Sequence, residues 1–141
     1  MLQKTKPKRR RKSKSLGKLK KELWDLVSEF VRRKDADHNG YVPCYTCGTV
    51  RHWKEQQAGH AIPGRHNAVL YDLDILRPQD VACNIFGNGR QHIFSTKLIK
   101  EHGMEWWDAK LAEAEKTIKY SRVDILEMTE AFKERLRELE S

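Results

Sequence analysis

The sequence predicts a small α+β domain, in which a short core containing strands lies between amphipathic helices. Two pairs of residues with the same two-residue gap mark this core: Cys44-Tyr-Thr-Cys47 and Asp80-Val-Ala-Cys83. Apolar residues recur at helical spacing before the first pair and after the second. Only 38% of the residues are hydrophobic and 34% are charged, so the apolar core must be small. We therefore expect an additional stabilising cross-link, such as a bound metal ion.

The N-terminal segment is strongly basic, and we expect residues 1–17 to be a disordered tail ahead of a single domain over residues 18–141. Residues 1–21 hold eleven Lys/Arg and no acid, whereas the remainder of the chain has 17 basic and 20 acidic residues. Such a block repels itself and buries little apolar surface. We predict that the tail binds nucleic-acid phosphates, the alternative being a solubilising terminus. Its densest part is Lys8, Arg9, Arg10, Arg11 and Lys12.

The first element of the domain is predicted to be a helix over residues 18–35. The turn pair Asn39-Gly40 follows it and stops the pattern. We expect its apolar stripe to pack into the core rather than to bind a partner. The stripe consists of Leu19, Leu23, Leu26, Val27, Phe30 and Val31.

The core is predicted over residues 41–92, and its first half contains the cysteine pair. Tyr41 to Val50 predicts a short strand, a knuckle and a return, with Gly48 permitting the tight turn. A further strand is expected between Trp53 and Ile62, and it ends at His60.

The second half of the core is predicted to hold a strand and a helix. Residues 63–67 are turn residues, and Val69 to Leu76 alternates in a way that favours a strand. A helix is expected from Asp80 to about Phe86, and it breaks near Gly87-Asn88-Gly89.

Residues 95–139 are predicted to be the C-terminal helices. Ser95 is expected to cap a short helix that ends near His102, and Glu105 to about Lys119 continues as helix. Ser121, with Asp124 three residues on, predicts a capping arrangement for a last helix to about Leu139.

Zinc is the expected staple, because it prefers four tetrahedral ligands and is well satisfied by thiolates. Cys44, Cys47 and Cys83 supply three ligands, and a carboxylate oxygen of Asp80 is the predicted fourth. The odd number of cysteines argues against a disulfide framework and for a reducing cytoplasm. Without a metal, Cys44 and Cys47 would be ordinary buried cysteines of a hairpin. Two histidines are the alternatives for the fourth position: His52 and His92.

Several short motifs occur in a fixed order along the chain. They are Cys44-Tyr-Thr-Cys-Gly48, Gln57-Ala-Gly-His60 with Pro63, Pro78-Gln79, Cys83-Asn84, and Leu98-Ile-Lys-Glu-His-Gly103-Met-Glu-Trp106. This order resembles the zinc-stapled HNH (ββα-metal) nucleases, and more narrowly the NinG/Rap recombination nucleases of bacteriophages. The resemblance covers roughly residues 19–139. It implies a ββα-metal core flanked by N-terminal and C-terminal helices.

The resemblance also implies a catalytic site. In HNH nucleases a histidine at the end of the first strand is the general base, and His60 matches it; neutral imidazole suits this role near pH 7. Asn84 matches a helix-borne ligand of a catalytic Mg²⁺ or Mn²⁺, and Asn88 is a second candidate ligand. Gly59 stands where many HNH enzymes have Asp or His, and Ile75 where an Asn is expected. Spacing leaves three more side chains open as ligands: His66, Asp72 and Asp74. Without catalysis, His60 would be a histidine packed in a strand.

Cationic and aromatic residues around these motifs are candidates for DNA contacts. Arg65 and Arg90 are predicted to hold phosphates, and Arg77 and Lys97 are further candidates. Trp106-Trp107 is expected to pack on a helix face rather than to stack on bases.

What the resemblance implies is a metal-dependent, structure-selective DNA endonuclease that cleaves Holliday junctions and D-loops in phage recombination. Its partner would be branched DNA in the host cytoplasm, and a homodimer is reasonable because a resolvase cuts two strands. Two alternatives remain: an HNH nicking or packaging-associated nuclease for ordinary duplex, and a non-catalytic zinc module that binds DNA. The chain has no run of 18 apolar residues and no secretory pattern, so no membrane contact is expected.

Overall fold

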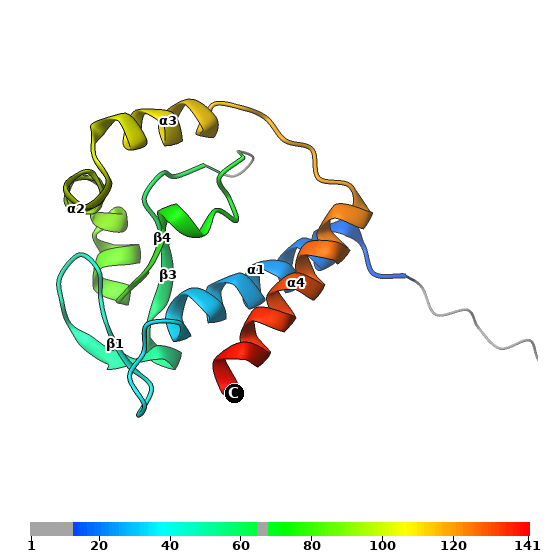
Figure 1. Cartoon of the computed structure of the whole chain (residues 1–141), viewed down its shortest axis with the longest axis horizontal. Coiled ribbons are helices and arrows are strands. Elements are labelled where there is room, and N and C mark those ends of the chain that lie inside the picture. The colour runs from blue at the N-terminus through cyan, green and yellow to red at the C-terminus, as the bar shows by residue number, and fades with distance from the viewer. Residues whose placement is uncertain (1–12, 65–67) are drawn as a thin grey trace, which may run out of the picture.

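The computed structural model describes residues 13–64 and 68–141, and it combines helices with two small antiparallel strand pairs. Figure 1 shows α1 and α4 packed side by side, with the pair β3–β4 between them and the helices α2 and α3. The helices are α1 (Leu16–Arg33), α2 (Gln91–His102), α3 (Met104–Ala114) and α4 (Arg122–Glu140). The strands are β1 (Tyr41–Pro43), β2 (Val50–His52), β3 (Gln57–His60) and β4 (Leu76–Gln79).

Helix α1 confirms the predicted leading helix and begins two residues earlier than expected. The Ser15 hydroxyl accepts a hydrogen bond from the backbone N–H of Lys18 at 3.2 Å, which satisfies one of the free donors at the helix start. Leu16 and Gly17 therefore belong to the helix rather than to the tail. Four apolar side chains spaced by four residues are buried along one face: Leu19, Leu23, Val27 and Val31.

The face of α1 packs against α4 and the strand pair. From α4, Ile125 is fully buried and Phe132 meets Phe30 of α1 edge to face, with ring centroids 6.0 Å apart. Ala58 of β3 and Leu76 of β4 close this core on the sheet side. The apolar stripe predicted to face the core does so.

A second apolar cluster lies between the strand pair and the helices α2 and α3. Phe94 and Leu98 of α2 are fully buried in it, and Trp107 of α3 is 9% exposed. They pack against Ile62, which follows the end of β3, and against Ile75, the last residue of η2 (Leu73–Ile75). Trp107 therefore packs on a helix face, as expected from the sequence.

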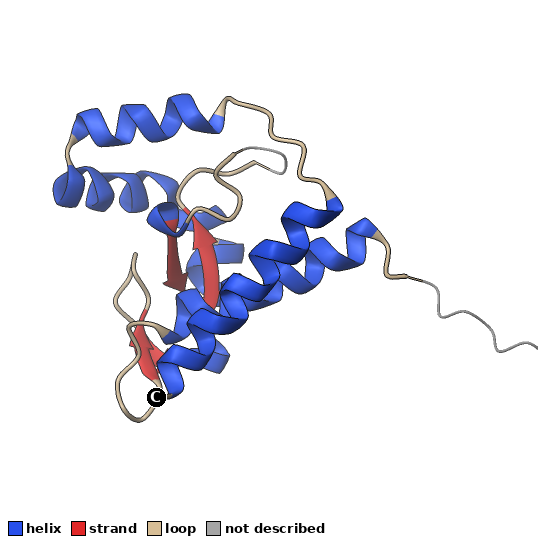
Figure 2. Cartoon of the chain, turned by 45° about the vertical axis from the view of Figure 1, so that its right-hand side comes forward, coloured by secondary structure: helices blue, strands red, loops and turns tan. Residues whose placement is uncertain are grey.

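Strands β3 and β4 pair antiparallel, with His60 opposite Leu76 and Gln57 opposite Gln79. Figure 2 shows this pair and the separate β1–β2 hairpin in red. The first strand ends at His60 as predicted, but the second strand was predicted over Val69 to Leu76 and this was wrong.

The segment before β4 is a turn followed by the 3-10 turn η2. The Asp72 carboxylate accepts a hydrogen bond from the backbone N–H of Asp74 at 2.9 Å, and this local cap holds the chain in a turn. Apolar alternation in the sequence therefore reflects a turn with buried residues on one side, and the pairing starts only at Leu76.

The helices after β4 differ from prediction at two boundaries. Residues Ala82–Phe86 form a short helical segment (η3) and Asn88–Arg90 a 3-10 turn, after which α2 starts at Gln91. Ser95 is therefore inside α2, where its hydroxyl donates to the carbonyl of His92 at 3.3 Å, and it is not the cap. Helix α3 ends at Ala114 rather than near Lys119, and in the segment that follows it the ring of Tyr120 packs on Tyr71 at 5.6 Å between centroids.

The last helix follows its predicted start. Ser121 and Asp124 form a capping box, in which each side chain accepts a hydrogen bond from the other residue's backbone N–H. Within residues 13–64 and 68–141, none of the helices combines the length and the apolar character needed to cross a bilayer.

Candidate functional site

Four predicted side chains come together as a candidate metal centre. The ligand atoms of Cys44, Cys47, Asp80 and Cys83 all lie within 4.8 Å of one another. The edge of a tetrahedron with zinc–sulfur bonds of about 2.3 Å is roughly 3.8 Å, so a small contraction would complete a zinc site. The donor set of three thiolates and a carboxylate fits zinc in its chemistry as well.

The first knuckle is built by a tight turn that needs glycine. Gly48 has a φ of +81°, and its N–H donates to the carbonyl of Cys44 at 2.9 Å. The backbone N–H of Tyr45 donates to the carbonyl of Pro78 at 2.8 Å. This bond ties the hairpin to the end of β4, which brings Asp80 beside Cys47.

Asp80 has a second contact besides its approach to the thiols. One carboxylate oxygen accepts from the backbone N–H of Cys83 at 2.8 Å, and the other lies 3.3 Å from the Cys47 sulfur. Burial opposes ionisation of this carboxyl, but these hydrogen bonds outweigh it and lower the pKa of Asp80 below its usual value. Asp80 is thus held ionised, as a metal ligand must be.

The thiols of the group differ in their environment. Burial raises the pKa of Cys83 to about 11. Burial also acts on Cys44, but hydrogen bonds from Thr46 and nearby backbone groups outweigh it and lower the pKa of Cys44 to about 7. Cys44 therefore forms a thiolate more readily than Cys83.

The two histidines that were alternatives for the fourth ligand lie elsewhere. Nδ1 of His52 accepts from the backbone N–H of Lys54 at 3.2 Å, and its ring packs edge to face on Tyr41. His92 is exposed on α2. Neither belongs to the group formed by the cysteines and Asp80.

His60 lies at the end of β3, on the wall of a cavity of about 540 Å³. Its ring stacks on Trp24 of α1, with ring centroids 4.9 Å apart. Its Nε2 is 3.0 Å from the carbonyl oxygen of Leu70. Because a carbonyl only accepts, Nε2 carries the hydrogen and Nδ1 is the basic nitrogen.

Burial also sets the charge of His60. Removal from water disfavours the imidazolium and lowers the pKa of His60 below 6.5, although the bond to Leu70 opposes this. His60 is therefore neutral at pH 7, which is the form that can accept a proton.

Asn84 lines the same cavity as His60, although 24 positions separate them in the sequence. It lies on η3, directly after Cys83, so the cysteine that joins the metal group also positions it. Its Nδ2 donates to Oε1 of Gln57 at 2.8 Å. Oδ1 is thus the atom of Asn84 that is left to bind a cation. Asn88 is exposed, has a φ of +52° and is not among the residues that line the cavity.

Close packing explains why the residue before His60 is a glycine. A Cβ added at Gly59 would lie 1.8 Å from Oε1 of Gln79, which lies on the neighbouring strand β4. Gln79 is fully buried, and its Nε2 donates to the Thr46 hydroxyl and to the Gly89 carbonyl. Gln79 therefore occupies the space that an acidic or histidine side chain at position 59 would need.

The other candidate ligands of the catalytic metal have different surroundings. Lys110 of α3 forms ion pairs with Asp72 at 2.6 Å and Asp74 at 2.8 Å. Both carboxylates therefore already share one cationic partner from a neighbouring helix. Ile75 is fully buried in the second apolar cluster, and His66 lies outside the described residues.

Only some of the residues predicted to contact phosphates lie in the part of the chain that the structure describes. The tail residues Lys8, Arg9, Arg10, Arg11 and Lys12, together with Arg65, lie outside the described residues. Arg90 is exposed at the start of α2, and its side chain covers Gly87. Arg77 is bound to backbone carbonyls of residues 73, 74 and 76, and Lys97 to the carbonyl of Tyr45, so both act within the fold.

One cation in the cavity was not predicted. Arg32 of α1 lines it together with His60 and Asn84. The sequence signal was the run Arg32-Arg33-Lys34 at the end of the leading helix, which is also typical of basic residues that complement a helix C-terminus. Only the packing of α1 against β3 separates the two possibilities.

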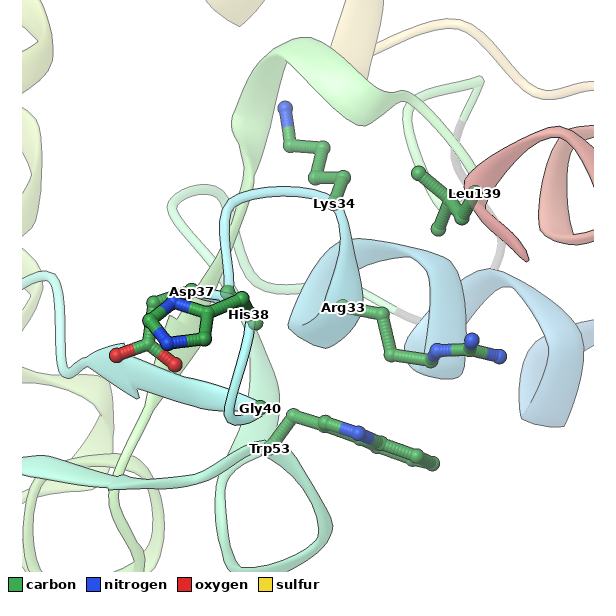
Figure 3. A pocket seen from close by; sticks show the side chains of 8 residues that line it. Arg33, Lys34, Asp37, His38, Gly40, Trp53 and Leu139 are labelled. Atoms are coloured by element: carbon green, nitrogen blue, oxygen red, sulfur yellow. The ribbon is translucent and has the colours of Figure 1, made fainter. Parts of the chain in front are cut away.

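A second pocket of about 400 Å³ lies next to this end of α1 (Figure 3). Arg33, Lys34 and Trp53 line it, with Asp37 and His38 on the opposite side. Its cations already have carboxylate partners. Arg33 lies 3.5 Å from Glu29 and 3.6 Å from Glu140, and Lys34 lies 3.9 Å from Asp35.

Comparison with known families gives one match. The family model described as bacteriophage lambda NinG protein matches residues 2–141. Searches of curated proteins and of solved structures found no match.

Proposed function

We propose that this chain, which belongs to the family of the bacteriophage lambda NinG protein, is a metal-dependent endonuclease that cleaves branched DNA. The observation that carries the proposal is the shared cavity of His60 and Asn84. A neutral histidine and an amide oxygen ligand face one space beside a candidate zinc site. Antiparallel β3 and β4 followed by the short helix η3 also agree with a ββα-metal core.

His60 would carry the general-base step. Its Nδ1 takes a proton from a water molecule while the water oxygen forms a bond to phosphorus. The bond from phosphorus to the leaving sugar oxygen breaks, and that oxygen takes a proton from solvent. The Leu70 carbonyl stabilises the imidazolium that results, because it accepts the hydrogen of Nε2.

Asn84 would hold the catalytic Mg²⁺ or Mn²⁺ through Oδ1, and Gln57 orients its amide. When bound there, such an ion supplies electrostatic stabilisation of charge on the phosphate. Asn88 remains a candidate ligand only if the 3-10 turn that carries it rearranges, because it faces solvent.

The group of Cys44, Cys47, Asp80 and Cys83 would bind zinc in a structural role. Its ligands come from the β1–β2 hairpin and from the residues at and just before the start of η3, so the ion would cross-link two segments that lie more than 30 positions apart in the sequence. The link also fixes Asn84, the residue after Cys83.

The substrate we infer is a Holliday junction or D-loop, which the chain would recognise by the shape and charge of the backbone. The basic tail supports this, since phosphate contacts carry no base sequence information. Family membership supports a role in phage recombination. Two copies would be needed to cut both strands of a junction at once.

The decisive experiment compares cutting of a four-way junction with cutting of its linear arms, with and without Mg²⁺ or Mn²⁺. His60→Ala should keep the fold and the zinc and lower the rate of cutting about 10²-fold or more. His92→Ala is the matched control, because His92 is exposed and lies outside both sites.

Other outcomes would favour the alternatives. Equal cutting of junction and linear arms would point to a nuclease of ordinary duplex. DNA binding without any metal-dependent cutting would point to a non-catalytic zinc module. A folded His60→Ala protein that cuts at the wild-type rate would refute the proposed general base.

A further inference from the structure

We propose that Arg32 of α1 binds the scissile phosphate, a role that rests on the proposed nuclease function and extends its site beyond the ββα core. The side chain reaches the cavity from a helix that precedes the zinc knuckle. It lines the cavity with His60 and Asn84, so a phosphate placed there would share one space with all three residues.

The guanidinium of Arg32 is held in place on one side only. Nε donates to the carbonyl and the hydroxyl of Ser28, both at 3.1 Å. Nη1 donates to the carbonyl of Trp53 at 3.0 Å. Within residues 13–64 and 68–141, Nη2 has no hydrogen-bond partner, so its two N–H groups are left for a ligand.

The charge of Arg32 has no direct counterion, unlike that of its neighbour. Arg33 is ion-paired with Glu29 and Glu140, whereas the described carboxylates all lie beyond ion-pair distance of Arg32. Both guanidinium carbons lie 5.2 Å from the centroid of the Trp53 ring. Two adjacent arginines thus share one aromatic ring but differ in whether an anion already neutralises them.

Partial burial makes the unpaired positive charge of Arg32 unfavourable in the protein without DNA. Arg32 is half-buried, and removal from water lowers the pKa of its guanidinium, although Glu29 and Asp25 oppose this from a distance. Arginine stays protonated in proteins, so the positive charge remains. A partly desolvated charge without a partner is unfavourable, and an incoming phosphate would relieve that cost.

A structural role alone explains only part of this arrangement. The bonds to Ser28 and Trp53 fix the end of α1 to the start of the 3-10 turn Trp53–Glu55 (η1). Those bonds use Nε and Nη1, and they do not give Nη2 a partner among the described residues. Guanidinium binds phosphate through two parallel N–H groups on different nitrogens; Nη2 can supply one of them, and Nη1, which has a second N–H besides the one bound to Trp53, can supply the other.

The test compares Arg32→Gln and Arg32→Lys with Arg33→Gln as the matched control. Each protein cuts a four-way junction that carries either the natural scissile phosphate or a neutral methylphosphonate at that position. Thermal unfolding and zinc content are measured in parallel. With the natural junction, Arg32→Gln should cut about 10²-fold more slowly than wild type, and Arg33→Gln within a few-fold.

The methylphosphonate separates phosphate contact from structural support. If Arg32 contacts this phosphate, neutralising the phosphate should slow wild type and Arg33→Gln much more than Arg32→Gln. Arg32→Lys keeps the positive charge but loses the two-pronged guanidinium, so its sensitivity to the methylphosphonate should lie between that of wild type and that of Arg32→Gln. It also preserves the test should Arg32→Gln unfold.

Failure of this inference is distinguishable from failure of the proposed function. Wild-type protein that does not cut DNA would refute the nuclease and the role of Arg32 together. The role of Arg32 alone would be refuted if wild type cuts DNA and the methylphosphonate slows Arg32→Gln or Arg32→Lys as much as it slows Arg33→Gln. In that case any loss of activity would be accounted for by the contacts to Ser28 and Trp53.

Discussion

At the scale of single residues, hydrogen bonds within the fold decide which side-chain atoms of the candidate site are available for chemistry. The Leu70 carbonyl takes the Nε2 hydrogen of His60, which leaves Nδ1 as the base. Gln57 accepts from Nδ2 of Asn84, which leaves Oδ1 as the ligand atom. In each case a partner within the fold selects which atom remains for chemistry.

The buried position of His60 predicts a pH dependence of cutting. The pKa of His60 is lowered below 6.5 by burial, so its basic form prevails at neutral pH and is lost only as pH falls through the lowered pKa. The logarithm of kcat/KM should therefore be level around pH 7 and decline only below 6.5. Zinc content over the same range is the control, since thiolate ligands also protonate in acid. An acidic decline centred above pH 7 would assign the base to another group.

Gly59 permits a close contact that a larger residue would break. Gly59→Ala brings a Cβ to within 1.8 Å of Gln79 Oε1, and the buried Gln79 can move only by giving up its bonds to Thr46 and Gly89. Chemical denaturation should show that Gly59→Ala lowers the free energy of unfolding by about 1–3 kcal/mol. Gly17→Ala is the matched control, because its added Cβ meets no atom within 4 Å, and it should change stability by no more than about 1 kcal/mol. Equal stability of the two variants would contradict the close packing.

Secondary-structure elements act in pairs in this fold. The β1–β2 hairpin supplies one half of the candidate metal centre, and the start of η3 supplies the other. Helix α1 contributes Trp24 and Arg32 to the cavity and packs its apolar stripe against α4. The support of α1 by α4 should therefore affect the site as well as the fold.

The contribution of α4 can be measured with two positions on the same helix. Ile125 is fully buried against α1, and Ile125→Ala should lower the free energy of unfolding by about 2–5 kcal/mol through lost contacts and a cavity. Val123 is 61% exposed, and Val123→Ala should change it by less than about 0.5 kcal/mol. Chemical denaturation of the zinc-loaded proteins gives both values. Similar values for the two variants would mean that α4 does not support α1.

At the scale of the whole molecule, the described part of the chain has two small apolar clusters instead of one large core, and the candidate metal centre lies beyond the end of β4. From the loop of the β1–β2 hairpin, Tyr45 packs on Phe94 of the second cluster. The backbone bond from Tyr45 to Pro78 and the side-chain bond from Gln79 to Thr46 also hold this loop, and the metal group would add a link through Cys44 and Cys47.

Loss of the metal should therefore unfold the knuckle cooperatively. We expect one zinc per chain, and Cys83→Ser should lose it, since structural zinc in such small sites is worth on the order of 10 kcal/mol. Asp80→Cys should retain the metal and bind it more tightly, because the site then has four thiolates. Metal analysis and thermal unfolding, with and without a chelator, give both results. Folded wild-type protein that contains no zinc would contradict this role.

Local patterns in the sequence determined the elements whose signals lie within a few residues of one another. These are the apolar stripe of α1, the turn at Gly48, the end of β3 at His60 and the capping box of α4. Helical periodicity, left-handed turns and caps are set by backbone geometry over one or two turns of chain. The matching spacing of the two ligand pairs likewise predicts the metal group.

Tertiary structure alone decided which distant residues share a space. The second strand begins at Leu76 because Asp72 caps a turn and binds Lys110 of α3, a partner that sequence spacing does not reveal. Arg32 enters the His60 cavity, and Arg33 is neutralised outside it, because α1 packs on β3 in one orientation. Such pairings depend on the packing of whole elements, whose energy is spread over many contacts far apart in the chain.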